Sequence, residues 1–129
     1  MRRLLLDTHA LLWWWSDDPA LPAAARKAIL IPDSTVFVSA ASAWEIATQH
    51  RLGNYPAGRH VIEEWDGRLA QDGFRQLTIA GAHALRAGSL PHAHRDPFDR
   101  MIAAQAMAQR ISVATPDPAI GALGADTIW

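Results

Sequence analysis

Residues 3–15, RLLLDTHALLWWW, contain the first strand and the first helix that the sequence predicts. Three consecutive leucines stop at Asp7, which predicts a short buried strand. From about residue 9 to residue 15 the apolar residues continue with the spacing of a helix. A charged residue that directly follows a buried strand in the sequence needs a compensating partner, so Asp7 is the first candidate functional residue.

The alternation of strand and helix continues along the chain. Residues 35–38, which are β-branched and aromatic, predict a second strand, and residues 40–52 predict a helix that Gly53 closes. The other expected helices cover residues 21–30, 60–70, 81–87 and 97–109, with a brief one after 115–118, and the other expected strands cover 74–79, 111–114 and 127–129. Strands separated by helices imply right-handed crossovers. We therefore predict an α/β fold, a three-layer sandwich whose parallel central sheet is flanked by helices and binds ligands beyond the carboxyl ends of its strands.

Length and composition limit the possible functions. The 129 residues predict one domain over residues 1–129, and the absence of cysteine excludes disulfide scaffolds, thiolate metal sites and cysteine nucleophiles. A net charge of −1 argues against a generally basic surface that holds nucleic acid by phosphate neutralisation alone. No apolar run approaches a membrane span, so we expect a soluble, cytoplasmic protein without a membrane partner.

Acidic residues recur where the apolar runs end. They are Asp7, Glu45, Asp96, Asp99 and Asp117. In a parallel sheet these places share one edge, where converging oxygen ligands form a site for a hard cation such as Mg2+ or Mn2+. Because such a cation accepts phosphate oxygens and activates water, the chemistry favoured is hydrolysis of a phosphodiester.

Most of these acids also have a purely structural interpretation. Residues 42–45, SAWE, match a capping box in which Glu45 reaches back to a backbone amide. Residues 96–99, DPFD, match an N-cap, a proline at the first helical position and an acid in the first turn, and residues 115–117 can form a similar cap. Their joint placement favours a site over separate caps.

The histidine-rich segment 92–96, HAHRD, resembles the His-x-His-x-Asp segment of metallo-β-lactamase-like zinc hydrolases. Pro97 stands where that pattern has another histidine, and the chain is short for that two-sheet fold. We therefore expect His94 and Arg95 in a loop that faces solvent or substrate.

Three consecutive tryptophans, residues 13–15, lie in the first expected helix. Successive helical residues point about 100° apart, so one buried face cannot cover all three rings. We expect at least one to be exposed or at an interface, with partial burial against the chain's own helices as the alternative.

Four segments in order resemble the motifs of PIN-domain ribonucleases, and most closely those of the VapC-like toxins of bacterial toxin–antitoxin systems. They are LLLDTHALLW (residues 4–13), SAWEI (42–46), HRDPFDRMIAAQA (94–106) and ATPD (114–117). The resemblance implies a PIN-like three-layer sandwich and an endoribonuclease that depends on Mg2+ or Mn2+. It also implies RNA as the substrate, a homodimer, and inhibition by a cognate antitoxin.

The resemblance also implies roles for single residues. Asp7 falls on the metal ligand at the strand end, Glu45 on the helix acid that positions metal or water, Asp99 on the third acid and Asp117 on the more variable fourth. Asp96 is an additional acid, and either it or Asp99 is the closer metal ligand. Hydroxyl supports near the acids would be Thr8, Ser39 and Thr115, and candidate phosphate contacts are Arg95 and Arg100.

A hypothesis from a different class remains open. In it the chain is a non-catalytic protein-binding module, its acids are helix caps, and the tryptophan run docks a partner. Metal dependence separates the two hypotheses, because a cluster of metal ligands gains thermal stability from Mn2+ and a set of caps does not.

Overall fold

The computed structural model describes residues 2–129. Its strands are β1 (Arg3–Leu6), β2 (Thr35–Ser39), β3 (Arg75–Leu77), β4 (Ser112–Ala114) and β5 (Thr127–Ile128). Its helices are α1 (Thr8–Ser16), α2 (Ala23–Leu30), α3 (Ala40–Arg51), α4 (Gly58–Glu63), α5 (Trp65–Asp72), α6 (Gly81–Ser89), α7 (Pro97–Gln109) and α8 (Pro118–Ala122). The elements expected from the sequence are present within a few residues of their expected bounds, apart from the helix over residues 60–70.

That segment forms two helices, α4 and α5, rather than one. Glu64 joins them with φ −107° and ψ 14°, outside the helical region. The bend still lets Val61 and Leu69, one on each side of it, reach the same hydrophobic core. No glycine or proline occupies position 64, so the usual signals of a helix end are missing there.

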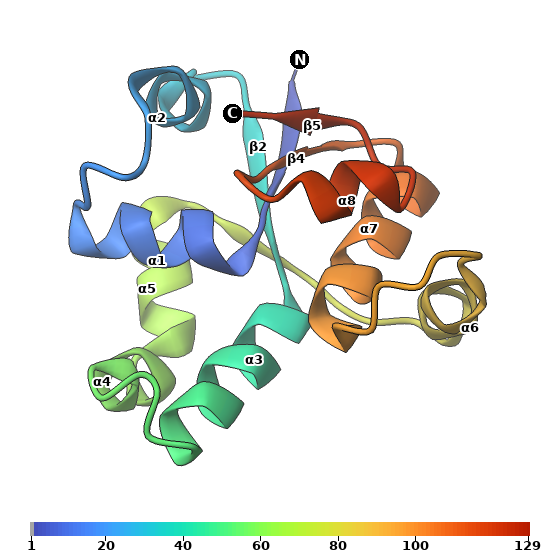
Figure 1. Ribbon diagram of the computed structural model, residues 1–129. Helices are drawn as coiled ribbons and strands as arrows, with labels where there is room; N and C mark the ends of the chain where they lie inside the picture. The colour runs from blue at the N-terminus through green and yellow to red at the C-terminus, as the bar shows by residue number, and fades with distance from the viewer. Residues whose placement is uncertain (1) are drawn as a thin grey trace.

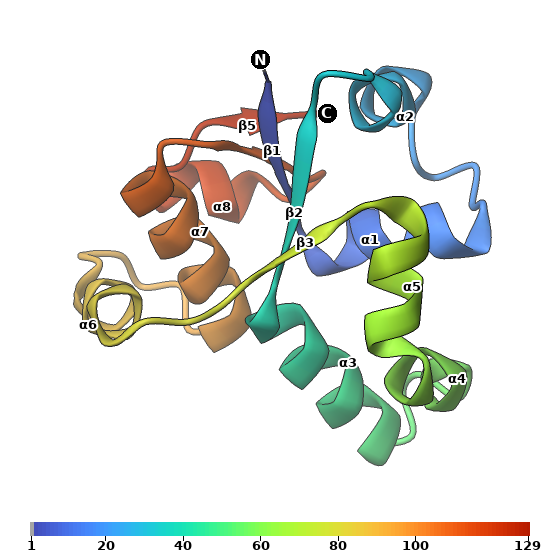
Figure 2. The same cartoon turned by 180° about the vertical axis from the view of Figure 1, so that it is seen from behind.

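The strands of the described chain form one parallel sheet in the order β3-β2-β1-β4-β5. Helices α1, α2 and α5 cover one face and α7 and α8 the other, as Figures 1 and 2 show from opposite sides. The predicted α/β architecture, a parallel central sheet flanked by helices, is confirmed. No helix within residues 2–129 is long and apolar enough to cross a membrane.

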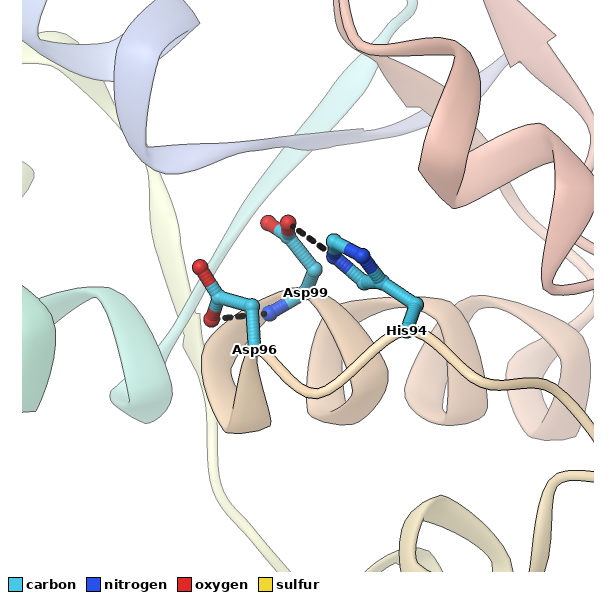
Figure 3. Close-up of side chains that lie close together, drawn as sticks. All are labelled: His94, Asp96 and Asp99. Carbon is cyan, nitrogen blue, oxygen red and sulfur yellow. Dashed lines mark hydrogen bonds and ion pairs between the residues drawn. The ribbon is translucent and has the colours of Figure 1, made fainter.

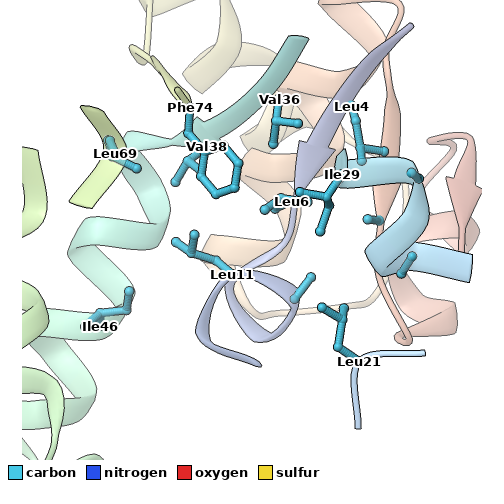
Figure 4. Packing of buried hydrophobic residues seen from close by; sticks show 14 of the residues in the cluster. Leu4, Leu6, Leu11, Leu21, Ile29, Val36, Val38, Ile46, Leu69 and Phe74 are labelled. Carbon is cyan, nitrogen blue, oxygen red and sulfur yellow. The ribbon is translucent and has the colours of Figure 1, made fainter. Parts of the chain in front are cut away.

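The three leucines of β1 serve both faces of this sheet. Leu4 and Leu6 point into a core shared with α1 to α5 (Figure 4), whereas Leu5 points into a second core with Ile102 of α7 and Ile120 of α8. All three leucines are fully buried. A strand covered on both faces explains the unbroken apolar run, because neither side of its pleat meets water.

The tryptophan run is packed inside the chain. Each ring of residues 13–15 is half-buried against the first core, so the expectation of an exposed ring is wrong. The aromatic partners are Trp129 for Trp13, Phe74 for Trp14 and Trp65 for Trp15. The alternative of partial burial against the chain's own elements is the one observed.

Candidate active site

Three strand ends meet at one edge of the sheet. The register pairs Leu6 of β1 with Val38 of β2 on one side and with Ala114 of β4 on the other. The residues that follow these ends, at the starts of α1, α3 and the α8 turn, therefore lie side by side (Figure 1). This is the carboxyl edge of the sheet, where the sequence predicts the site.

Asp7 is anchored at the centre of this edge. Its side chain is buried, its Oδ1 accepts a hydrogen bond from the backbone amide of Ala10 at 2.8 Å, and its Oδ2 accepts one from the Thr115 hydroxyl at 2.5 Å. The Thr115 hydroxyl in turn accepts from the amide of Asp117 at 3.0 Å. Thr115 thus ties the acid after β1 to the acid after β4. A carboxylate oxygen has two lone-pair sites, so these bonds leave Asp7 able to bind a cation.

Glu45 is not part of a capping box, contrary to that interpretation of residues 42–45. Helix α3 begins earlier, at Ala40, and its N-cap is Ser39, whose hydroxyl accepts from the Ala41 amide at 3.0 Å. Ser42 is buried inside the helix, where its hydroxyl lies 2.9 Å from that of Thr8. The Glu45 side chain is therefore not used as a cap.

His94, Asp96 and Asp99 form the tightest group of ligand atoms in the described chain (Figure 3). One ligand atom from each residue lies within 4.8 Å of the others. Asp96 caps α7 through Oδ1, which accepts from the Phe98 amide at 2.8 Å and the Asp99 amide at 3.2 Å. Asp99 Oδ2 lies 2.8 Å from His94 Nε2. His94 thus joins the acids, a role that sequence reasoning missed.

Asp117, at the start of α8, is the last of the five predicted acids. It caps α8 with Oδ1, which accepts from the Ala119 amide at 2.9 Å. Within residues 2–129 the Oδ2 atoms of Asp96 and Asp117 accept no hydrogen bond. Capping therefore uses one oxygen of each carboxylate and does not exclude a second role as a ligand.

The electrostatics show that these acids face one another. Burial raises the pKa of Asp99, the His94 hydrogen bond opposes that rise, and the charges of Asp96 and Asp117 reinforce it. Burial likewise raises the pKa of Asp7, to which Asp99 adds a smaller repulsion. Asp99 is thus the shared neighbour of the other acids at this edge.

The charges of the same cluster also act on Glu45. Burial raises the pKa of its carboxyl, the Thr8 hydroxyl opposes the rise, and the charges of Asp96 and Asp99 add to it. Converging carboxylates whose charged forms are disfavoured by burial and by each other fit a divalent cation, which would neutralise them. The donor set of oxygens with one imidazole suits Mn2+ at least as well as Mg2+.

The predicted hydroxyl supports lie in two places. The buried Thr115 hydroxyl donates to Asp7 and the buried Thr8 hydroxyl interacts with Glu45, whereas the Ser39 hydroxyl donates to Gln105 of α7. The Arg100 guanidinium donates to the carbonyls of Ala87, Gly88, Leu90, His92 and His94. Arg100 therefore ties the end of α6 and the loop after it to α7, and its role as a phosphate contact stays a prediction.

A hollow opens beside the acid cluster. It has a volume of about 330 Å3, and its lining includes Thr8, His9, Glu45 and Gln49. Glu45 is therefore the acid of the cluster that is reachable from this hollow.

Asp96 allows its two roles to be separated. Asparagine caps a helix as well as aspartate does, so Asp96→Asn should leave the unfolding temperature nearly unchanged while Mn2+ affinity falls about tenfold or more. Asp96→Ala should also lose roughly 0.5–2 kcal/mol of stability with the cap. Thermal unfolding and Mn2+ titration measure the two effects. Wild-type Mn2+ affinity in Asp96→Asn would restrict Asp96 to capping.

The fold and the site define an α/β protein that gathers carboxylates at the carboxyl edge of a parallel sheet. The chain belongs to the PIN domain family, because the family model of the PIN domain matches residues 4–125. The family resemblance drawn from the four sequence motifs is confirmed. No curated protein sequence matches the chain.

Solved structures of similar fold cover nearly the whole chain. A chain of VapBC2 from Rickettsia felis, bound to a DNA fragment from its promoter, has a TM-score of 0.71 and 14% identity over 98% of this chain and 97% of its own. A chain of FitAcB from Neisseria gonorrhoeae has a TM-score of 0.70 and 23% identity over 98% and 96%. A chain of a toxin–antitoxin complex from Klebsiella pneumoniae has a TM-score of 0.65 and 19% identity over 98% and 96%.

Proposed function

We propose that this protein is a metal-dependent endoribonuclease that hydrolyses phosphodiester bonds with Mg2+ or Mn2+. The observation that carries the proposal is the convergence of Asp7, Glu45, Asp96 and Asp117 on Asp99, where burial and mutual repulsion raise the pKa of three of the five carboxyls. Without a cation, the charged forms of these carboxyls are disfavoured by burial and by one another, and a bound cation would neutralise them.

The proposed ligands are Asp7, Asp99, Glu45 and Asp117, with Asp96 and His94 close enough to join them. A divalent cation bound there would polarise the scissile phosphate and supply a hydroxide nucleophile at neutral pH. Thr115 keeps Asp7 in one orientation through its hydrogen bond. Glu45, half-buried beside the hollow, is placed to orient a water molecule or to accept its proton.

The proposed biological role is that of a toxin inhibited by a cognate antitoxin. Its support is the family membership together with the likeness of fold to chains from toxin–antitoxin complexes. RNA as the substrate and homodimerisation are proposed from the same resemblance, and a cytoplasmic location is proposed from the sequence. Co-expression with the product of a short neighbouring reading frame should give a co-purifying complex that no longer cleaves RNA.

Cleavage of RNA by the purified protein tests the proposed activity. Single-stranded RNA should be cut in Mn2+ or Mg2+, left intact in EDTA, and cut again when excess Mn2+ is restored, because the acids need a cation to hold a phosphate. DNA of the same sequence serves as the comparison substrate. RNA that stays intact in Mn2+, or is cut equally in EDTA, would refute the proposal.

A non-catalytic binding module remains a second candidate, because Asp7, Asp96 and Asp117 all cap helices. Glu45 and Asp99 do not cap, and the tryptophan run packs within the chain. The capping hypothesis therefore leaves the two non-capping acids and their raised pKa values without a role.

A further inference from the structure

Trp44 is exposed at the edge of the acid cluster. The residue is 56% exposed, and it directly precedes the half-buried Glu45 on α3. The tryptophans of residues 13–15 are half-buried against the core, so Trp44 stands apart from them. Its aromatic ring is therefore available to a ligand beside the acids, and aromatic rings are the surfaces on which unpaired bases stack.

The ring of Trp44 is held in place by the helix that carries the acids. It packs edge-to-face on Phe98 of α7, with ring centroids 4.6 Å apart and an interplanar angle of 76°. Phe98 is buried and lies between Asp96 and Asp99 in the sequence. The aromatic surface is therefore fixed relative to the carboxylates.

A second hollow lies beside this ring. It has a volume of about 230 Å3, and its lining includes Trp44, Ala84, Ala87, Arg95, Pro97 and Met101. Arg95 is exposed and makes no hydrogen bond or ion pair with another residue of the described range 2–129. The hollow thus combines apolar walls, an aromatic ring and a cation without an acidic partner.

This combination suits an unpaired nucleotide. Bases of single strands stack on aromatic rings, and arginine adds a charge for the backbone phosphate. Glu45 and Asp96 each directly follow one of the two residues, so the hollow borders the acid cluster. A peptide could fill the apolar part, but the charge of Arg95 beside a phosphodiester site favours a nucleotide.

We propose that Trp44 and Arg95 form a subsite for the nucleotide next to the scissile phosphate, with its base stacked on Trp44 and a flanking phosphate contacted by Arg95. This proposal rests on the proposed ribonuclease function. It adds a requirement for an unpaired base at one fixed position, which the acid cluster alone does not impose.

The stacking is tested by a double-mutant cycle that combines a substitution of Trp44 with the removal of one base from the RNA. Cleavage of a short single-stranded RNA by the wild type in Mn2+ first locates the cut bond. Removing the adjacent base, or making Trp44→Ala, should each lower kcat/KM about tenfold, mainly through KM. The two changes together should lower it no more than either alone, and Trp44→Phe should retain most of the activity.

Controls separate stacking from a general loss of structure. Leu52, at the end of the same helix and 55% exposed, provides the matched change Leu52→Ala, which should stay within about twofold of the wild type. Arg95→Gln should weaken RNA binding and reduce its dependence on salt by about one phosphate contact. The arm with the base removed uses the wild-type protein, so it does not depend on the folding of a variant.

Each outcome decides the proposal. Equal cleavage by the wild type and Trp44→Ala, or losses that multiply when the two changes are combined, would overturn the subsite while leaving the ribonuclease function intact. Loss of inhibition by the antitoxin in Trp44→Ala, with RNA cleavage unchanged, would instead assign the hollow to a protein contact. Absence of cleavage by the wild type would refute the proposed function and the subsite together.

Discussion

The substitution Asp99→Asn should lower the rate of RNA cleavage by at least about a hundredfold. It removes the negative charge of a proposed metal ligand that is the shared neighbour of the other acids. Asp99 is the residue whose pKa responds to both Asp96 and Asp117 and which also repels Asp7 and Glu45. Asparagine is nearly the same size and can keep the contact with His94. The loss should therefore come from the missing charge rather than from a rearranged helix.

Stability provides the internal control for this variant. In EDTA at neutral pH, Asp99→Asn should unfold at a higher temperature than the wild type, because a partly buried and repelled charge is removed. Asp33→Asn, in an exposed turn, should change neither activity nor stability. Wild-type cleavage by Asp99→Asn would rule out Asp99 as a ligand, and a large drop in its metal-free stability would point to a structural role.

Thermal stabilisation by Mn2+ is the second large expected effect. A ligand present at a hundred times its Kd stabilises the folded state by about 2.7 kcal/mol, which corresponds to roughly 10 °C in a domain of this length. The wild type should show this gain at neutral pH. Asp99→Asn should lose most of it.

The gain from Mn2+ should also depend on pH. The folded pKa values of Asp7, Glu45 and Asp99 lie above their ordinary values of 3.8, 4.5 and 3.8, first because of burial. Without metal, these groups favour folding most below the ordinary values, and their contribution is lost as pH rises through the folded pKa values. Mn2+ binds the deprotonated carboxylates, so its effect should shrink as the pH falls toward these ordinary values and protons compete for the carboxylates.

Unfolding curves at several pH values, with EDTA and with Mn2+, measure this dependence. Addition of NaCl at equal ionic strength controls for general screening of charge. An unfolding temperature that Mn2+ leaves unchanged at pH 7.5 would contradict the metal site. A gain that keeps its size when the pH is lowered to about 4, near the ordinary pKa values of these carboxyls, would contradict their involvement.

Much of the fold was predictable because local signals and long-range packing agree in this chain. The three leucines of β1 form an unbroken apolar run because both faces of the strand are covered. Asp96 and Pro97 mark the start of α7 by capping and by the fixed φ of proline, and the predicted bounds of 97–109 are the observed ones. The strand ends then place the acids at one edge.

The rest depended on contacts between distant residues. The three tryptophans find partners in Trp129, Phe74 and Trp65, which no local pattern reveals. Arg100 bonds to carbonyls of the loop after α6, a geometry set by how that loop folds back on α7. Residues 42–45 have the residue types of a capping box, but the helix predicted from residue 40 and observed from Ala40 begins too early for Ser42 to be its N-cap.

His94 is the clearest omission from the predicted site. Its imidazole meets Asp99 five residues later because the chain turns at Asp96 and Pro97 and brings the loop alongside the first turn of α7. The segment HAHRD does not fit the zinc pattern that it resembles, and the remaining signal in it is a histidine two residues before an N-cap aspartate. Such a signal becomes specific only when the turn geometry is known.

We propose above all that the acids at the carboxyl edge of the sheet bind a divalent cation for phosphodiester hydrolysis. The most direct test is Mn2+ binding at neutral pH, measured by the decrease of the free Mn2+ signal in electron paramagnetic resonance. The wild type and Asp33→Asn should bind Mn2+ equally and saturably, and Asp99→Asn should bind at least about tenfold more weakly. Equal binding by all three proteins, or no saturable binding by the wild type, would contradict the claim.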